Sequence, residues 1–322
     1  MTGGARYLLA DVFTDRPFGG NQLAVFPEGG KVSPELMPVI ARELNLSETV
    51  FVLPPDDPEH AARLRIFTPA SELPFAGHPT VGTACVLVAE GMVVTRPDGT
   101  AGQEGAAGAL GLTGPEGADF VLELGVGPVS VRVRGGGQTY HARFDVPRLP
   151  EMVPDPPATD ELAKALGLGV DDLRVPGWKP EVWSCGVPFL VIPIRDRSAL
   201  ARARLDTSRW ERSIAPTGVS HLYLLSPDPE LAGSSLRARM FAPGLGITED
   251  PATGSAASTL GGFLGVREPE PHGPFSWRIE QGFEMGRPSL IDLEIEKRDG
   301  AVALVRVGGD CVLMGEGRLD ID

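Results

Sequence analysis

A pattern that occurs twice constrains the fold more than any other feature of this sequence. In each copy an alternating segment ends in Phe-x-Pro, an acidic loop follows, and a glycine opens an apolar segment with helical spacing. The first Phe-x-Pro occupies residues 67–69 and the second occupies 241–243. Two related lobes are therefore expected, and they would offer the N-termini of two buried helices to one cleft.

The chain has 322 residues, which exceeds the usual size of one domain and favours two lobes. A glycine recurs at every third position from 102 to 117, and this segment is interpreted as a flexible hairpin or linker near the lobe boundary. We expect an N-terminal lobe at 1–118, completed by a closing segment at 308–322, and a C-terminal lobe at 119–307.

Charge and cysteine content exclude several classes of protein. The formal net charge of −14 argues against nucleic acid or an acidic membrane as a partner, because both are anionic. Three well separated cysteines, Cys85, Cys185 and Cys311, form no Cys-x-x-Cys pair and indicate no disulfide framework. No run of 18 apolar residues occurs, and Met1 to Phe13 does not read as a signal peptide. These features together predict a cytoplasmic protein.

The second copy of the pattern leads into the acidic stretch 246–257. Asp250 and Pro251 precede a Thr-Gly-Ser turn and a run of small residues, which indicates a carboxylate beside an uncovered helix start. Such a place suits a small anionic ligand. The alternative is that Thr253 and Ser255 only cap a core helix.

The first copy places a histidine at the start of a buried helix. Pro79 suits the first helical position, and residues 81–89 are apolar on nearly every face. The helix dipole would disfavour a charged imidazole at His78 and leave a neutral ring that can donate or accept a proton. A lone histidine is more commonly structural, so this alternative stays open.

Two further polar residues lie at a predicted strand start and beside a predicted turn. Glu48 precedes the apolar strand 49–53, where it is either an acid/base group with a raised pKa or a solvated residue at a strand edge. Asn21 follows Gly19 and Gly20, and either faces a ligand or supports a turn.

The chemistry expected of these residues is proton transfer without a cofactor or a metal. The five histidines form no metal-binding spacing, and no phosphate loop or dinucleotide fingerprint is present. What remains is a set of acid/base groups near predicted helix starts, where amides could stabilise an enolate-like charge; the set is Glu48, Glu72, His78, Glu249 and Asp250.

These residues fall in segments that resemble the phenazine-biosynthesis isomerase-like family, which shares its fold with diaminopimelate epimerase and proline racemase. The matching segments follow the expected order over almost the whole chain: Asp11-Val12-Phe13-Thr14 with Gly20-Asn21, Asn45-Leu46-Ser47-Glu48-Thr49, Phe67-Thr68-Pro69 with Gly77-His78-Pro79-Thr80, Glu249 to Ala256, and Gln281-Gly282 with Gly286-Arg287-Pro288.

The resemblance implies an α+β fold of two similar lobes, each a curved, mostly antiparallel sheet or barrel around a central helix, with the site in the cleft between. It implies that Glu48 moves a proton between two carbons of a small carboxylic acid, with His78 and Asp250 as partners. Gly77, Gly254 and Ser255 match positions that hold the substrate, and Asn21 and Arg287 are further candidates. A homodimer is implied in the same way.

Two other functions stay open. The racemase branch uses paired cysteines, but no cysteine stands in the two motifs here, and Cys85 falls inside the predicted helix as a core residue. A two-cysteine amino-acid racemase or epimerase is therefore the second hypothesis. The third is a binding protein whose site has lost its activity.

Overall fold

The computed structural model describes residues 4–95, 101–102 and 117–321. The chain forms two compact units: unit 1 comprises 1–147 together with 308–322, and unit 2 comprises 148–307. The first boundary between the two units therefore lies after residue 147, whereas it was predicted between residues 118 and 119. The reason is that the strands between 118 and 145 pair with unit 1, so they complete its sheet rather than begin a new one. Most of the glycine-repeat segment, 103–116, lies outside the described residues.

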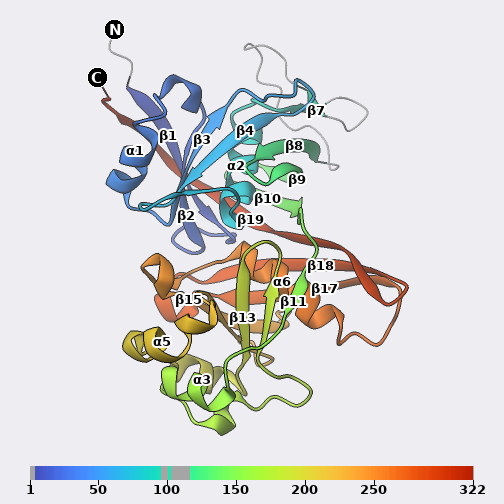
Figure 1. Ribbon diagram of the computed structural model, residues 1–322. Helices are drawn as coiled ribbons and strands as arrows, with labels where there is room; N and C mark the ends of the chain where they lie inside the picture. The colour runs from blue at the N-terminus through green and yellow to red at the C-terminus, as the bar shows by residue number, and fades with distance from the viewer. Residues whose placement is uncertain (1–3, 96–100, 103–116, 322) are drawn as a thin grey trace. The chain divides into compact units, whose positions relative to one another are not determined.

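Unit 1 is a closed barrel of 8 strands (Figure 1). Around the barrel, each strand pairs with the next and the last pairs with the first. In this order the strands are β1 (Ala5–Val12), β2 (Asn21–Phe26), β3 (Glu48–Leu53), β4 (Ala62–Phe67), β8 (Ala118–Leu124), β9 (Gly127–Gly136), β10 (Thr139–Asp145) and β19 (Ala301–Leu319). Pairing is parallel between β2 and β3 and between β4 and β8.

The helix α2 (Gly77–Ala89) is buried inside unit 1 along nearly its whole length. Gly82 allows it to approach the barrel wall, because a Cβ there would lie 2.6 Å from Leu23 and 2.7 Å from Val12. Since the helix is apolar on all sides, only a central position buries all its faces. This confirms the predicted arrangement of a sheet around a central helix.

The remaining elements of unit 1 lie outside the barrel strands. Ser33 and Pro34 predict a helix start, but the helix α1 (Met37–Leu44) begins later and has Pro38 in its first turn. The other elements are η1 (Gly29–Lys31), β5 (Glu72–Leu73), β6 (Val94–Thr95) and β7 (Ala101–Gly102).

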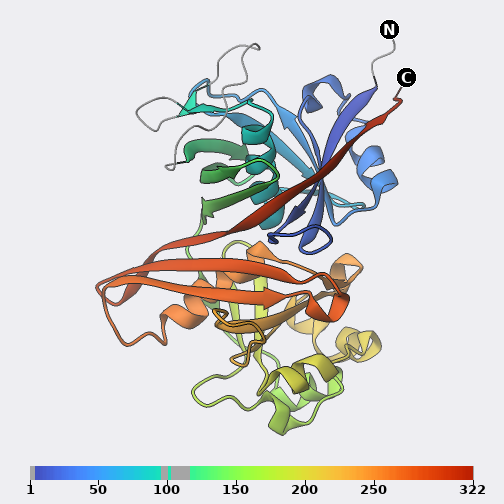
Figure 2. The same cartoon turned by 180° about the vertical axis from the view of Figure 1, so that it is seen from behind.

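Unit 2 repeats the strand order of unit 1. Its strands are β11 (Glu151–Val153), β12 (Glu181–Ser184), β13 (Pro188–Pro193), β14 (Leu222–Ser226), β15 (Leu236–Ala242), β16 (Ile247–Asp250), β17 (Gly273–Gln281) and β18 (Ser289–Arg298). Antiparallel and parallel pairs alternate from β12 to β18 as they do from β1 to β9. The turn at Asp299 and Gly300, both at positive φ, leads into the long continuous strand β19. Figure 2 shows β19 running to the C-terminus beside β1, with Leu319 opposite Ala5.

The helix α6 (Gly254–Gly265) occupies the position in unit 2 that α2 has in unit 1. It contacts β18, β12 and β13, and its residues are almost all buried. At Gly262 any Cβ would overlap the ring of Trp183, so glycine is required for this close approach. Both copies of the sequence pattern thus fold as a strand, a short strand and a buried helix.

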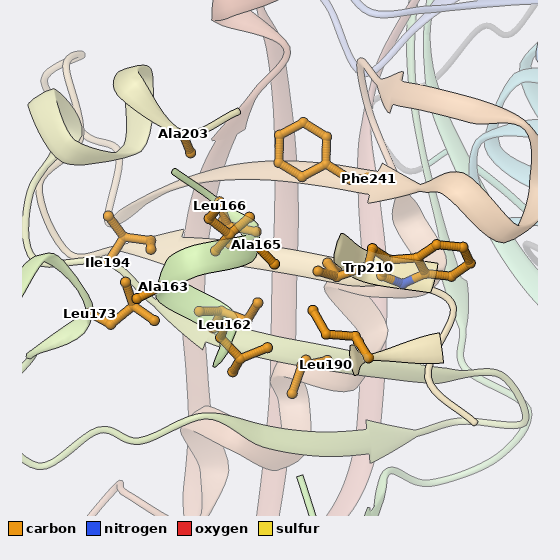
Figure 3. Packing of buried hydrophobic residues seen from close by; sticks show 14 of the residues in the cluster. Leu162, Ala163, Ala165, Leu166, Leu173, Leu190, Ile194, Ala203, Trp210 and Phe241 are labelled. Carbon is orange, nitrogen blue, oxygen red and sulfur yellow. The ribbon is translucent and has the colours of Figure 1, made fainter. Parts of the chain in front are cut away.

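Unit 2 also has an outer layer of helices, whereas unit 1 has α1 outside its barrel strands. The helices α3 (Thr159–Ala165), α4 (Arg197–Arg202) and α5 (Thr207–Ser213) pack on β13, β14 and β15 through an apolar cluster that includes Leu190, Leu222 and Phe241 (Figure 3). Three 3-10 helices complete the local structure near these elements: η2 (Val170–Leu173), η3 (Ala215–Thr217) and η4 (Pro243–Leu245); η5 (Phe283–Met285) follows β17. Among the described residues, no helix is long and apolar enough to cross a membrane.

Candidate active site

Three predicted site residues of unit 1 meet at one edge of the barrel. Asn21 is the first residue of β2, Glu48 is the first residue of β3, and His78 is the second residue of α2. The two strands are parallel, with Leu23 beside Glu48, so both begin at the same edge of the sheet. The start of α2 reaches that edge from inside the barrel, because Gly77 and His78 are buried.

The imidazole of His78 lies between the other two side chains. Its Nε2 is 3.3 Å from Oε2 of Glu48, and its Nδ1 is 3.3 Å from Nδ2 of Asn21. The side chains of His78 and Glu48 are only 4% and 12% exposed. The 3.3 Å approach of Nε2 to Oε2 is a close contact and not a hydrogen bond between these two atoms. Glu48 is therefore not a solvated residue at a strand edge.

Burial keeps the His78 ring neutral. It lowers the pKa of His78 from 6.5 to about 3, while a hydrogen bond with the backbone of Gln22 acts in the opposite direction. The neutral ring was expected from the helix dipole, but loss of solvation is the main cause. At pH 7 the contact of His78 with Glu48 is thus not an ion pair, because the imidazole is neutral.

The start of α2 adds backbone donors to this group. The residue before the helix, Ala76, caps no amide through its side chain, and Gly77 is the first residue of the helix. The first amides of a helix point along its axis and carry partial positive charge. This arrangement can stabilise negative charge that develops on a substrate next to Glu48 and His78.

In unit 2 a buried carboxylate lies just before α6. Asp250 ends β16 and is 7% exposed, and its Oδ2 accepts a hydrogen bond of 2.5 Å from the Thr253 hydroxyl. The Gln281 amide donates to the Asp250 carbonyl at 2.8 Å and to the Thr253 hydroxyl at 2.9 Å. Thr253 occupies the cap position of α6 but its side chain makes no capping bond. The hydroxyl therefore fixes a carboxylate rather than only capping a helix.

The other predicted residues of unit 2 surround the same turn. Gly254 and Ser255 are the first two residues of α6. Arg287 belongs to a loop that packs against this turn, because its amide donates to the Gly282 carbonyl, and Gly282 has a φ of +76° and leaves no room for a Cβ beside Pro251. Ser289 donates to the Pro251 carbonyl at 2.8 Å. Asp250, Gly254, Ser255 and the backbone of Arg287 are thus gathered in unit 2.

Sequence reasoning missed three residues that hold Asp250 in place. Thr253 was predicted only as a helix cap, Gln281 was named only in a matching segment, and no role was predicted for Tyr223. The Tyr223 hydroxyl donates to Oε1 of Gln281 at 3.2 Å, and burial together with the charge of Asp250 raises the pKa of Tyr223. The Asp-x-x-Thr spacing was a usable signal for Thr253, whereas the contact of Tyr223 with Gln281 joins residues 58 positions apart.

The cysteines are poor candidates for proton transfer. Cys85 is fully buried in α2, and burial together with a hydrogen bond to Cys311 raises its pKa well above the usual value. Burial raises the pKa of Cys185 to about 12. A cysteine base must be a thiolate, and these environments favour the thiol. Among the described residues, no group of three or more His, Cys, Asp and Glu side chains is placed to hold a metal ion.

Comparison with known proteins gives matches along the whole chain. The family model described as phenazine biosynthesis-like protein matches residues 10–317. An uncharacterised isomerase of Mesorhizobium japonicum is 40% identical, with 98% of each chain covered. The trans-2,3-dihydro-3-hydroxyanthranilate isomerase of Pseudomonas aeruginosa is 32% identical, with 97% of this chain and 98% of the relative covered. The crystal structure of a predicted epimerase from Pseudomonas aeruginosa is 32% identical, with a TM-score of 0.75 over 99% of this chain and 100% of that chain.

Proposed function

The chain belongs to the phenazine biosynthesis-like family and is an isomerase, and we propose that it moves a proton between two carbons of a small carboxylic acid without a cofactor. The observation that carries this proposal is the buried Glu48 carboxylate 3.3 Å from a neutral His78 ring at the start of α2. A carboxylate in such surroundings can remove a proton from carbon and return it.

The proposed reaction balances within the substrate. Glu48 takes a proton from one carbon, and the electron pair left behind spreads into the adjacent unsaturated or carboxylate group. Amides at the start of α2 stabilise that charge. The protonated Glu48 then gives the proton to a second carbon, or to the other face of the first. His78 packs against the Glu48 side chain at 3.3 Å, and its uncharged ring adds no positive charge that would oppose protonation of Glu48.

Unit 2 supplies the second part of the proposal. Asp250 is proposed as a further acid/base or charge-holding group, and the amides of Gly254 and Ser255 together with Arg287 as groups that bind the polar end of the substrate. Support comes from the gathering of these residues around one turn of unit 2 and from the resemblance of their segments to the family pattern. The proposed location is the cytoplasm, and a homodimer is the proposed assembly.

The relatives suggest where a substrate search should begin. A relative 32% identical is named for the isomerisation of trans-2,3-dihydro-3-hydroxyanthranilate, a cyclic amino acid. We therefore propose cyclic acids with a carbon–hydrogen bond next to a double bond as the first substrates to test. Proline and other amino acids test the epimerase alternative.

The experiment is a screen of such acids with the wild-type protein in deuterated water, followed by NMR. We expect one class of acid to exchange a carbon-bound proton for deuterium, with Glu48→Gln inactive on the same compound while its unfolding temperature stays near that of the wild type. Undiminished exchange in Glu48→Gln would remove the assigned role. If no acid in the screen exchanges a proton with the wild-type protein, the result would instead support a binding function.

A further inference from the structure

Unit 2 contains a cavity of about 460 Å³ that the proposed reaction does not use. Its location follows from strand pairing. Met240 lies opposite Asp250 in the pairing of β15 with β16, so these two side chains share one face of the sheet. Arg239 and Phe241 flank Met240 and point to the other face, where both line the cavity. The cavity and the Asp250 carboxylate thus lie on opposite faces of the same strand pair.

Two arginines converge at one wall of this cavity. Nη1 of Arg204 donates to the Ala203 carbonyl at 2.7 Å, and Nη1 of Arg239 donates to the same oxygen at 2.8 Å. Because both Nη1 atoms donate to one oxygen, the two guanidinium groups lie close together. Each guanidinium is fixed further, Arg204 by the Ala201 carbonyl and Arg239 by the Leu200 carbonyl. Figure 3 shows Ala203 and Phe241 within the apolar cluster under this wall.

Two arginines and two glutamates line the cavity. The Glu249 carboxylate binds Arg239 through two hydrogen bonds of 2.8 Å. Among the described residues, no carboxylate forms an ion pair with Arg204. Glu284 also lines the cavity and is paired with Arg237 at 2.9 Å, and Arg237 is shared with Glu230 and Glu280. Arg204 is thus a positioned cation with donors left over, on a protein whose net charge is −14.

Unit 1 provides an internal comparison, because it contains the same arginine–glutamate pair. Arg65 binds Glu72 through two bonds of 2.7 Å and lies over Phe67 at 4.9 Å, as Arg239 lies over Phe241 at 4.9 Å. In unit 1 the Nη1 group of Arg65 donates to the sulfur of Met37, which belongs to α1, at 3.4 Å. The pair itself is therefore structural in both units. What distinguishes unit 2 is the second arginine and the cavity beside it.

We infer that this cavity is a second ligand site, which takes a small monocarboxylic acid with an apolar body. The carboxylate is held by Arg204, whose planar donors suit two oxygens. The body packs on apolar walls formed by Leu205, Phe241, Pro243 and Ile247. The volume lies in the range of sites that enclose small metabolites. A ligand here rests against β16 from the face opposite Asp250, so the site is separate from the proposed reaction.

The test measures binding of 3-phenylpropanoate and hexanoate to the full chain by ligand-observed NMR and calorimetry, with 3-phenylpropanamide as the uncharged probe. We expect saturable binding of the acids and binding at least about tenfold weaker for the amide, because the charged hydrogen bonds are lost. Arg204→Gln should weaken acid binding by about tenfold or more. Ile247→Trp should abolish binding, because the larger tryptophan side chain fills the cavity.

Matched controls separate this site from the others. Arg202→Gln changes a neighbouring arginine that pairs with Asp172 and does not line the cavity, and it should leave binding unchanged. Glu48→Gln should also bind the acids as the wild type does. Acid binding that survives Arg204→Gln and Ile247→Trp, an amide that binds as well as the acid, or no saturable binding at all would each overturn the inference. None of these outcomes depends on whether the protein catalyses exchange.

Discussion

The starts of the two buried helices, α2 and α6, use the same scaffold for different chemistry. Each follows a Phe-x-Pro strand and a short acidic strand, and each begins with glycine. At α2 a histidine follows the glycine, and the nearby Glu48 carboxylate contacts a neutral ring at 3.3 Å. At α6 a threonine precedes the glycine and donates a 2.5 Å hydrogen bond to Asp250.

The difference concerns how firmly each carboxylate is held. A hydroxyl that donates to a carboxylate, and is itself fixed by an amide, stabilises the charged form of Asp250. The neutral imidazole of His78 contacts Glu48 without a hydrogen bond between Nε2 and Oε2 and brings no positive charge, so it does not favour the charged form of Glu48 in the same way. The comparison teaches that one architecture can hold two carboxyl groups in different surroundings, which fits the proposed proton carrier in unit 1 and a more firmly held group in unit 2.

The largest expected effect comes from neutralising the two carboxylates in turn. On an acid found in the exchange screen, Glu48→Gln should lower the rate of deuterium incorporation by about 10³-fold or more, as expected for loss of a positioned acid/base. Asp250→Asn should lower it by about 10-fold to 10²-fold, because the substituted amide keeps the shape of the group. Rates measured by NMR at equal protein concentration decide this. A larger loss in Asp250→Asn would reverse the assignment of roles.

The next effect tests whether Thr253 fixes Asp250. Thr253→Val keeps the shape of the side chain but removes the donor to the carboxylate, so the free energy of unfolding should fall by about 2 kcal/mol. Thr83→Val in α2 is the matched control, because the Thr83 hydroxyl is buried without a hydrogen-bond partner. That change should be neutral or stabilising. Urea unfolding of both variants gives the values, and equal losses would show that the Thr253 bond contributes nothing.

The third effect, about 1.4 kcal/mol for each pH unit, concerns the neutral ring of His78. The unfolded chain takes up this proton near pH 6.5, but the folded chain does not until about pH 3. Between these values the unfolded state binds more protons, so the stability that the neutral ring contributes above pH 6.5 is lost as the pH falls. The slope is about 1.4 kcal/mol per pH unit for one group.

The measurement is urea unfolding at several pH values between 6.5 and 4. His221 adds to the wild-type slope with the same sign, because burial also lowers its pKa. The difference between the wild type and His78→Gln therefore isolates His78, and it should be about 1.4 kcal/mol per pH unit. His272→Gln changes an exposed side chain and serves as the control. Identical slopes in all three proteins would mean that the folded chain takes up the His78 proton at the same pH as the unfolded chain.

Much of the fold could be predicted from local pattern. Alternating strands, the apolar faces of the helix at 81–89 and the glycine at each helix start constrain which segments are buried, because an all-apolar helix has to be central. The boundary near 147 could not be predicted, because it depends on β8 pairing with β4 across more than 50 residues. The start of α1 was also placed too early, since both Pro34 and Pro38 suit a first turn.

The sequence by itself determined the family pattern, the repeated Phe-x-Pro units and the candidates Glu48, His78 and Asp250. These depend on residue type and spacing along the chain. Only the tertiary structure decided that the Glu48 carboxylate contacts His78, that Thr253 binds Asp250 rather than merely capping α6, and that Arg204 joins Arg239 beside a cavity. Such contacts connect residues far apart in the chain, and the burial that keeps His78 neutral exists only once the barrel closes around it.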